Sequence, residues 1–90
     1  MAERHIIQFY GTVQGVGFRY TACRIAAQYT ITGYVQNLPD GSVKCVAEGE
    51  PGEIDRFIDE LTERMAGHIR STDRDTAPAT NEWTAFGVRY

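Results

Sequence analysis

The spacing of apolar residues changes once near the start of the chain. Within residues 4–13, Ile7, Phe9 and Val13 fall on one face and polar residues fill most positions of the other. A period of two is typical of a strand with one buried face. Within residues 18–29, apolar residues recur every three or four positions. This spacing predicts a helix with one apolar stripe.

The same succession returns later with an extra strand. Residues 31–38 and 42–48 predict two strands joined by a Pro-Asp-Gly turn, as in a hairpin. Pro51 is suited to the first turn of a second helix, whose apolar stripe ends before Gly67. Apolar residues again occupy alternate positions within residues 83–90, which predicts a final strand.

Residues 68–75 have no apolar alternation. A strand is needed here to complete the repeated unit, yet the segment contains Thr72 and Arg74 where apolar residues would be expected. An unpaired guanidinium under a helix would be costly to bury. We therefore expect an irregular or solvent-facing segment.

The order of the elements predicts an α+β fold of the ferredoxin-like sandwich type. It reads βαββαβ with an added C-terminal strand, which suggests an antiparallel sheet carrying both helices on one face. A helix between the first two strands returns the chain to its starting end, so both strands run the same way and the third fits antiparallel between them. Residues 1–90 are expected to form one domain.

Composition narrows the possible partners. The formal net charge is −3 at pH 7, which argues against a surface built for nucleic-acid backbones. No stretch approaches the length of a membrane span, and the first apolar run is too short for a signal peptide. Cys23 and Cys45 lack metal-ligand spacing and are interpreted as buried, reduced thiols. We expect a cytoplasmic monomer with neither a membrane nor a nucleic-acid partner.

The stretch between the first strand and the first helix has the chemistry of an anion site. Gly15 and Gly17 can adopt positive φ values and turn successive N–H groups toward one point. A helix starting at Phe18 adds its N-terminal N–H groups, and Arg19 can donate two hydrogen bonds to a phosphate. The spacing matches neither the P-loop nor the dinucleotide-binding fingerprint. An ordinary strand-to-helix turn with a solvated arginine remains the alternative.

Asn37 is the second candidate. It lies two residues after Val35, so both side chains point to the same face of the predicted second strand. The ends of the first and second strands would lie two strand spacings apart, roughly 10 Å, a gap that Arg19 and Asn37 could cover together. The alternative is a local role for Asn37 in the following turn.

These segments resemble the acylphosphatase family. The resemblance rests on Gly-Thr-Val-Gln-Gly-Val-Gly-Phe-Arg at 11–19 and Gly-Tyr-Val-Gln-Asn-Leu-Pro-Asp-Gly-Ser-Val at 33–43, and extends over essentially the whole chain. It implies hydrolysis of small acyl phosphates to carboxylate and inorganic phosphate, without metal or cofactor. It also implies that Arg19 binds phosphate and Asn37 orients the attacking water. The substrate-binding residues implied are Gln14, Gly15, Val16, Gly17, Phe18 and Arg19.

Two other functions fit the same fold. One is a non-enzymatic phosphate- or RNA-binding module, in which Tyr10 and Tyr34 would face outward on the sheet as stacking platforms. The other is a carbamoyl-phosphate-handling module of the kind found within larger maturation enzymes. The acidic composition weighs against RNA, and the absence of a further domain weighs against the second.

Overall fold

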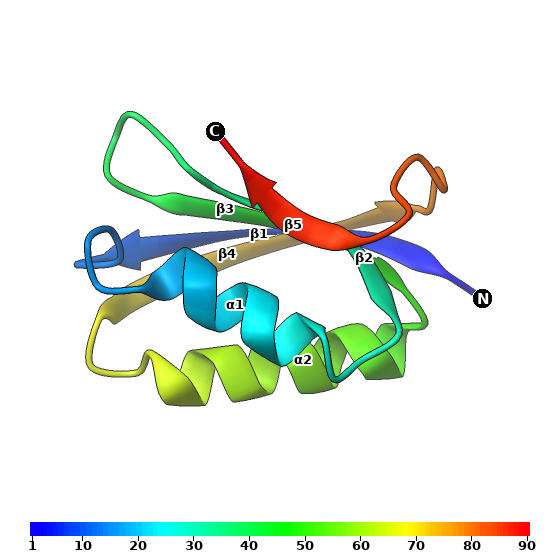
Figure 1. Cartoon of the computed structure of the whole chain (residues 1–90), viewed down its shortest axis with the longest axis horizontal. Coiled ribbons are helices and arrows are strands. Elements are labelled where there is room, and N and C mark those ends of the chain that lie inside the picture. The colour runs from blue at the N-terminus through cyan, green and yellow to red at the C-terminus, as the bar shows by residue number, and fades with distance from the viewer.

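The computed structural model describes residues 1–90. Its elements are β1 (Glu3–Gly11), α1 (Phe18–Ala26), β2 (Ile31–Asn37), β3 (Val43–Gly49), α2 (Pro51–Arg64), β4 (Ile69–Pro78) and β5 (Phe86–Arg89). The five strands form one sheet in the order β4-β1-β3-β2-β5, and both helices cover the same face of it (Figure 1). The predicted ferredoxin-like sandwich is confirmed.

β3 lies between β1 and β2 and pairs antiparallel with each, as the sequence predicts. The added strand, β5, pairs with β2 in the sheet's one parallel ladder, so the sheet is mixed and not wholly antiparallel as expected. In the register, Ile7 is opposite Cys45 and Cys45 is opposite Val35. These three side chains are fully buried on the helix side. Since β1 and β2 run the same way, the loop that follows β1 and the turn that follows β2 lie at the same end of the sheet.

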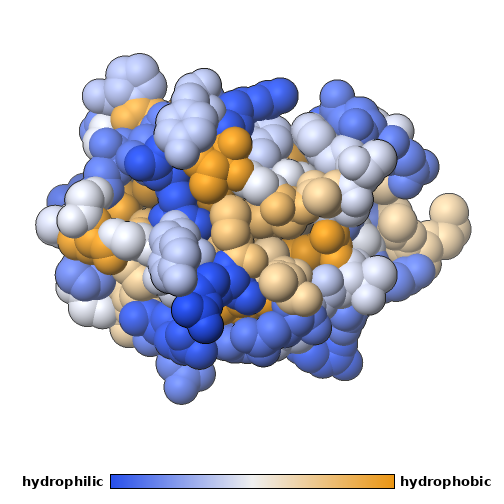
Figure 2. Space-filling view, in the orientation of Figure 1, coloured by the Kyte–Doolittle hydropathy of each residue, from blue (hydrophilic) through white to orange (hydrophobic).

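Alternate strand residues and one stripe of each helix make a single core. Burial of each large apolar side chain contributes about 1.5–3 kcal/mol. Phe57 of α2 packs edge-to-face on Phe86 of β5, with ring centroids 5.3 Å apart, and so ties the short last strand to the core. Figure 2 shows apolar surface over β5 and the adjoining part of α1, bordered by polar residues. The fully buried large side chains are Ile7, Phe9, Val13, Phe18, Ile25, Val35, Val43, Cys45, Ile54, Phe57 and Leu61.

The first helix is shorter than predicted. It ends at Ala26, and the N–H groups of Gln28 and Tyr29 donate to carbonyls three residues back, at Ile25 and Ala26. The apolar spacing continues through this tighter turn, so the pattern alone places the boundary too late. The Tyr29 hydroxyl still packs inward and donates to Glu60 of α2 over 2.8 Å.

The irregular backbone expected at residues 68–75 is wrong, whereas the expected solvent exposure is correct. Residues 69–75 lie in β4, an edge strand that pairs with β1 over nearly its whole length, and His68 belongs to the turn before it. Backbone pairing with β1 does not require an apolar face. Arg74 lies on the helix side, where its guanidinium donates to His5 and pairs with Asp55 of α2. The charge therefore has partners and is only partly desolvated.

Candidate active site

The loop between β1 and α1 holds a row of free backbone donors. Gly15 and Gly17 have φ values of 76° and 79°, in the left-handed region. A Cβ on either would meet nothing within 4 Å, so the loop has open space beside both glycines. The N–H groups of residues 15–20 donate to no acceptor in the protein. A row of free N–H groups in a glycine loop at a helix N-terminus is suited to an oxyanion.

The start of α1 strengthens this donor site. Gly17 is the N-cap and supplies no side-chain acceptor, and the first turn contains no acidic residue. The partial positive charge of the helix N-terminus is therefore uncompensated. Phe18 is buried and packs on Phe9 of β1 with ring centroids 5.0 Å apart, which fixes the helix start against the sheet.

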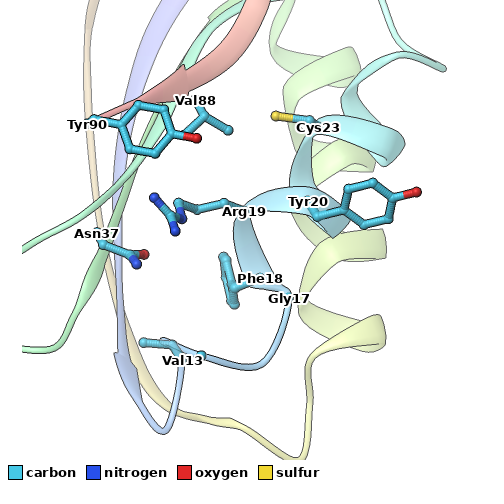
Figure 3. Close-up of a pocket in the computed structure, with 10 residues that line it drawn as sticks. Val13, Gly17, Phe18, Arg19, Tyr20, Cys23, Asn37, Val88 and Tyr90 are labelled. Carbon is cyan, nitrogen blue, oxygen red and sulfur yellow. The ribbon is translucent and has the colours of Figure 1, made fainter.

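Arg19 places a cation beside these N–H groups. Its guanidinium projects from the first turn of α1 toward Asn37 (Figure 3). It makes no hydrogen bond or ion pair within the protein, and its aromatic contact is the Tyr90 ring, 5.3 Å from Cζ to the centroid. The planar donor groups thus remain available for a bidentate ligand such as phosphate.

Asn37 ends β2 and faces the helix side of the sheet, as its parity with Val35 predicts. Its Oδ1 is buried and has no hydrogen-bond partner. Buried amide oxygens are normally bonded because leaving them unpaired costs free energy. The local turn role considered from sequence would require bonds to neighbouring backbone, and the side chain makes none.

Arg19 and Asn37 meet at a hollow of about 350 Å³. Arg19 crosses its middle, with Val13 and the glycine loop on one side and Val88 and Tyr90 of the C-terminal strand region on the other (Figure 3). The walls are largely apolar, so the guanidinium and the loop N–H groups act in surroundings poor in competing charge. The lining residues are Val13, Gly15, Gly17, Phe18, Arg19, Tyr20, Cys23, Asn37, Val88 and Tyr90.

Two residues of the predicted binding segment do not line the hollow. The Gln14 amide donates instead to the carbonyls of Leu38 and Ser42, at 2.8 and 2.9 Å. Val16 is half-buried and packs against the core. The structure therefore brings Gly15, Gly17, Phe18 and Arg19 together with Asn37, and places Gln14 and Val16 outside.

Five residues that line the hollow were not predicted from the sequence, and only some of them could have been found from sequence spacing. Cys23 lies four residues after Arg19, a spacing that puts both on one helix face. Partial burial raises the pKa of the Cys23 thiol. The sequence predicted that this thiol would be buried, whereas it is half-buried. Val88 and Tyr90 could be found only by knowing that β5 pairs with β2. The missed residues are Val13, Tyr20, Cys23, Val88 and Tyr90.

Comparison with known proteins decides the family. The acylphosphatase family model matches residues 5–88. The chain belongs to the acylphosphatase family. An acylphosphatase from Yersinia pseudotuberculosis is 47% identical over the whole of both chains. Another from Lactobacillus gasseri is 44% identical over 89% of this chain and 90% of its own.

Solved structures agree with this acylphosphatase assignment. The crystal structure of the acylphosphatase from Bacillus subtilis matches the whole chain with a TM-score of 0.84 and 26% identity, and all of that chain is covered. Full-length HypF in its phosphate- and nucleotide-bound form matches with a TM-score of 0.88 and 29% identity, but only 12% of that chain is covered. The family is one of hydrolases, whose substrates are small acyl phosphates.

No three His, Cys, Asp or Glu side chains lie together in a way that could hold a metal ion. None of the helices has the length and apolar character needed to cross a membrane.

Tyr34, one of the two tyrosines considered as stacking platforms, is covered by other side chains. It points to the open face of the sheet but is only 8% exposed. The Trp83 ring packs on it with centroids 5.6 Å apart, and the Arg89 guanidinium lies 4.1 Å above it. Bases stack on uncovered rings. Tyr34 thus faces outward on the sheet, as the alternative required, but its covered ring is not available for stacking.

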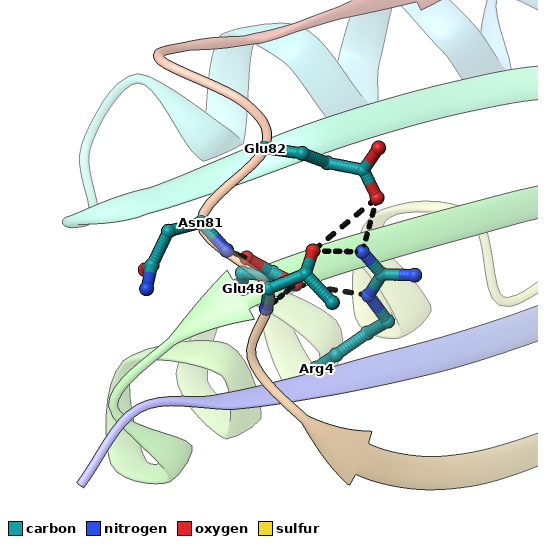
Figure 4. Close-up of polar contacts among 5 residues, drawn as sticks. Arg4, Glu48, Asn81 and Glu82 are labelled. Carbon is teal, nitrogen blue, oxygen red and sulfur yellow. Dashed lines mark hydrogen bonds and ion pairs between the residues drawn. The ribbon is translucent and has the colours of Figure 1, made fainter.

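A polar cluster on the same face holds the segment that carries Trp83 (Figure 4). The Glu48 side chain is 3% exposed, and its carboxylate accepts from the Arg4 guanidinium at 2.9 Å. It also accepts hydrogen bonds from the backbone N–H groups of Thr80 and Asn81, at 2.8 and 2.9 Å. Burial alone would raise the pKa of Glu48, but these donors outweigh it and hold the pKa below its usual range. Both oxygens of the Glu48 carboxylate thus have donors within the protein, so its role is structural.

We predict that Glu48→Gln destabilises the fold by about 1–3 kcal/mol near neutral pH, because it removes the charge that Arg4 and the two N–H groups recognise. Since the folded-state pKa of Glu48 is lowered, its contribution is complete above the unfolded pKa and is lost as pH falls through the folded pKa. The melting temperatures of wild type and variant should therefore converge below about pH 4. A difference that stays constant into acid would contradict the role of the charge.

Proposed function

We propose that the hollow is the site of acyl-phosphate hydrolysis in this chain. The loop N–H groups and Arg19 bind the phosphoryl group, and Asn37 orients the attacking water. The observation that carries this assignment is that the N–H groups of residues 15–20 and the Arg19 guanidinium have no hydrogen-bond partner in the protein, and that Gly15, Gly17, Phe18 and Arg19 line one hollow. The unpartnered Oδ1 of Asn37 supplies an acceptor for a water hydrogen beside them.

This arrangement suits the charge changes of phosphoryl transfer. The transition state is loose in most analyses, with negative charge spread over the equatorial oxygens of the transferring group. Fixed donors aimed at those oxygens stabilise it without having to reorganise, and removal of one such donor typically slows turnover ~10²–10³-fold. Arg19 adds a full positive charge to the same oxygens, so its removal should cost at least as much.

The proposed mechanism requires no protein acid or base. The leaving group is a carboxylate whose conjugate acid has a pKa of about 4, so it departs unprotonated near neutral pH. The attacking water loses one proton, which a phosphoryl oxygen of the substrate can accept. The hollow accordingly contains no His, Asp or Glu among its lining residues. Water attack breaks the bond between phosphorus and the acyl oxygen and gives carboxylate and inorganic phosphate.

We further propose that residues 1–90 act as one catalytic domain and function as a cytoplasmic monomer without a nucleic-acid partner. The two catalytic side chains come from β2 and α1 of the same chain, so no second copy is needed to complete the site. The covered face over Tyr34 supports the absence of an RNA role.

Replacement of Arg19 by Gln should reduce kcat/KM for benzoyl phosphate at least ~10²-fold, because the charge opposite the phosphoryl oxygens is lost. Arg19→Lys should also be strongly impaired, since an ammonium lacks the planar fork. Arg24→Gln is a matched control, because Arg24 lies on the same helix, is exposed and does not line the hollow. A folded Arg19→Gln protein retaining more than a tenth of wild-type activity would exclude this role.

Replacement of Asn37 by Ala should separate turnover from affinity. We expect kcat for benzoyl phosphate to fall at least tenfold while the inhibition constant for inorganic phosphate changes less than about twofold, because the amide is assigned to the water. Steady-state kinetics with phosphate as a competitive inhibitor measure both quantities. A loss of phosphate affinity as large as the loss of kcat would place Asn37 on the anion instead.

A further inference from the structure

The side chain of Gln14 has no donor left for a ligand. Its Nε2 group carries two hydrogens, and these are directed to the carbonyl oxygens of Leu38 and Ser42, at 2.8 and 2.9 Å. Gln14 is also absent from the residues that line the hollow. Its position inside the phosphate-binding segment therefore needs an explanation other than contact with phosphate.

The two carbonyls belong to the turn that follows Asn37. Leu38 is the next residue in the chain, and its N–H donates to the Ser42 carbonyl at 2.9 Å. The N–H of Gly41 donates to the Leu38 carbonyl at 3.1 Å. Gln14 thus joins both ends of a closed turn, and each carbonyl that it contacts also has a backbone partner.

This link spans elements that are not neighbours in the sheet. β3 separates β1 from β2, so no backbone ladder connects the phosphate loop directly to the strand that ends in Asn37. The Gln14 amide makes that connection with two hydrogen bonds. It therefore adds a direct tie between the phosphate loop and the turn next to Asn37.

We propose that Gln14 is a positioning residue that sets the distance between the phosphate-binding loop and Asn37. The role rests on the proposed function, in which phosphate is bound on one side and water is held on the other. Displacement of a reacting group by about 1 Å can cost up to ~10²-fold in rate. Loss of the link should loosen the water relative to the phosphoryl group and leave the loop N–H groups and Arg19 intact.

The test uses Gln14→Met, which keeps the length of the side chain and removes both donors. We expect kcat for benzoyl phosphate to fall about tenfold, with less than a twofold change in the inhibition constant of inorganic phosphate. Gln8→Met is the matched control, because the Gln8 amide donates to the Ser42 hydroxyl at 2.8 Å and reaches the same turn without touching the phosphate loop. Its kcat should stay within twofold of wild type. If Gln14→Met fails to fold, Gln14→Ala removes the same donors without their replacement by a thioether.

A double-mutant cycle tests whether Gln14 acts through Asn37. If it does, adding Gln14→Met to Asn37→Ala should lower kcat by less than about twofold, because the water is already released.

Unchanged kcat in Gln14→Met, multiplicative losses in the double variant, or an equal loss in Gln8→Met would each overturn the positioning role while leaving the proposed function intact. A loss of phosphate affinity matching the loss of kcat would assign Gln14 to the anion and overturn it as well. Absence of turnover in wild type would overturn the proposed function together with the positioning role.

Discussion

Unsatisfied backbone N–H groups at the start of α1 are the feature on which the rest of the site depends. Helices usually begin with a side chain that bonds one of these groups, and Ser, Thr, Asp or Asn is the usual choice. Here the cap is Gly17, in a left-handed conformation with no side-chain acceptor. An acidic cap would occupy the donors and repel a phosphate. The glycine cap forgoes that local stabilisation and keeps the donors available for a ligand.

The surrounding fold keeps this exposed helix end in place. Phe18 is buried directly after the cap and packs on Phe9, so the first turn of α1 is fixed to β1. The helix returns the chain to β2, which runs parallel to β1, and this brings Asn37 to the same end of the sheet as the loop. The core thus determines where the donors point, and the loop needs few contacts of its own.

The sequence was sufficient to predict those parts of the site whose geometry depends on residues close together in the chain. Glycine permits the positive φ found at Gly15 and Gly17, and the side-chain direction of Asn37 follows from its lying two residues after Val35 on the same strand. The hydrogen-bond partners of the Gln14 side chain could not be predicted, because they are two carbonyls in a turn 24 and 28 residues away. Tyr90 reaches the site only through the pairing of β5 with β2, which the residue pattern does not specify.

The errors in the predicted fold have related causes. β4 contains few apolar residues because it is an exposed edge strand, and its regularity comes from backbone pairing with β1. Charged side chains on such an edge also oppose pairing with other chains. The end of α1 was placed too late because apolar spacing persists through the tighter turn after Ala26. In both places backbone hydrogen bonds, which leave little trace in hydropathy, determined the outcome.

The central claim is that the loop N–H groups and Arg19 form one anion site, and binding of inorganic phosphate tests it most directly. Phosphate at ten times its Kd should stabilise the protein by about 1.4 kcal/mol, and each kcal/mol should raise Tm by ~4–8 °C for a domain of this size. Chloride at equal ionic strength is the control. The account predicts that wild type and Asn37→Ala show the shift and that Arg19→Gln loses it. Equal shifts in wild type and Arg19→Gln would mean that phosphate binds elsewhere, and the site would be contradicted.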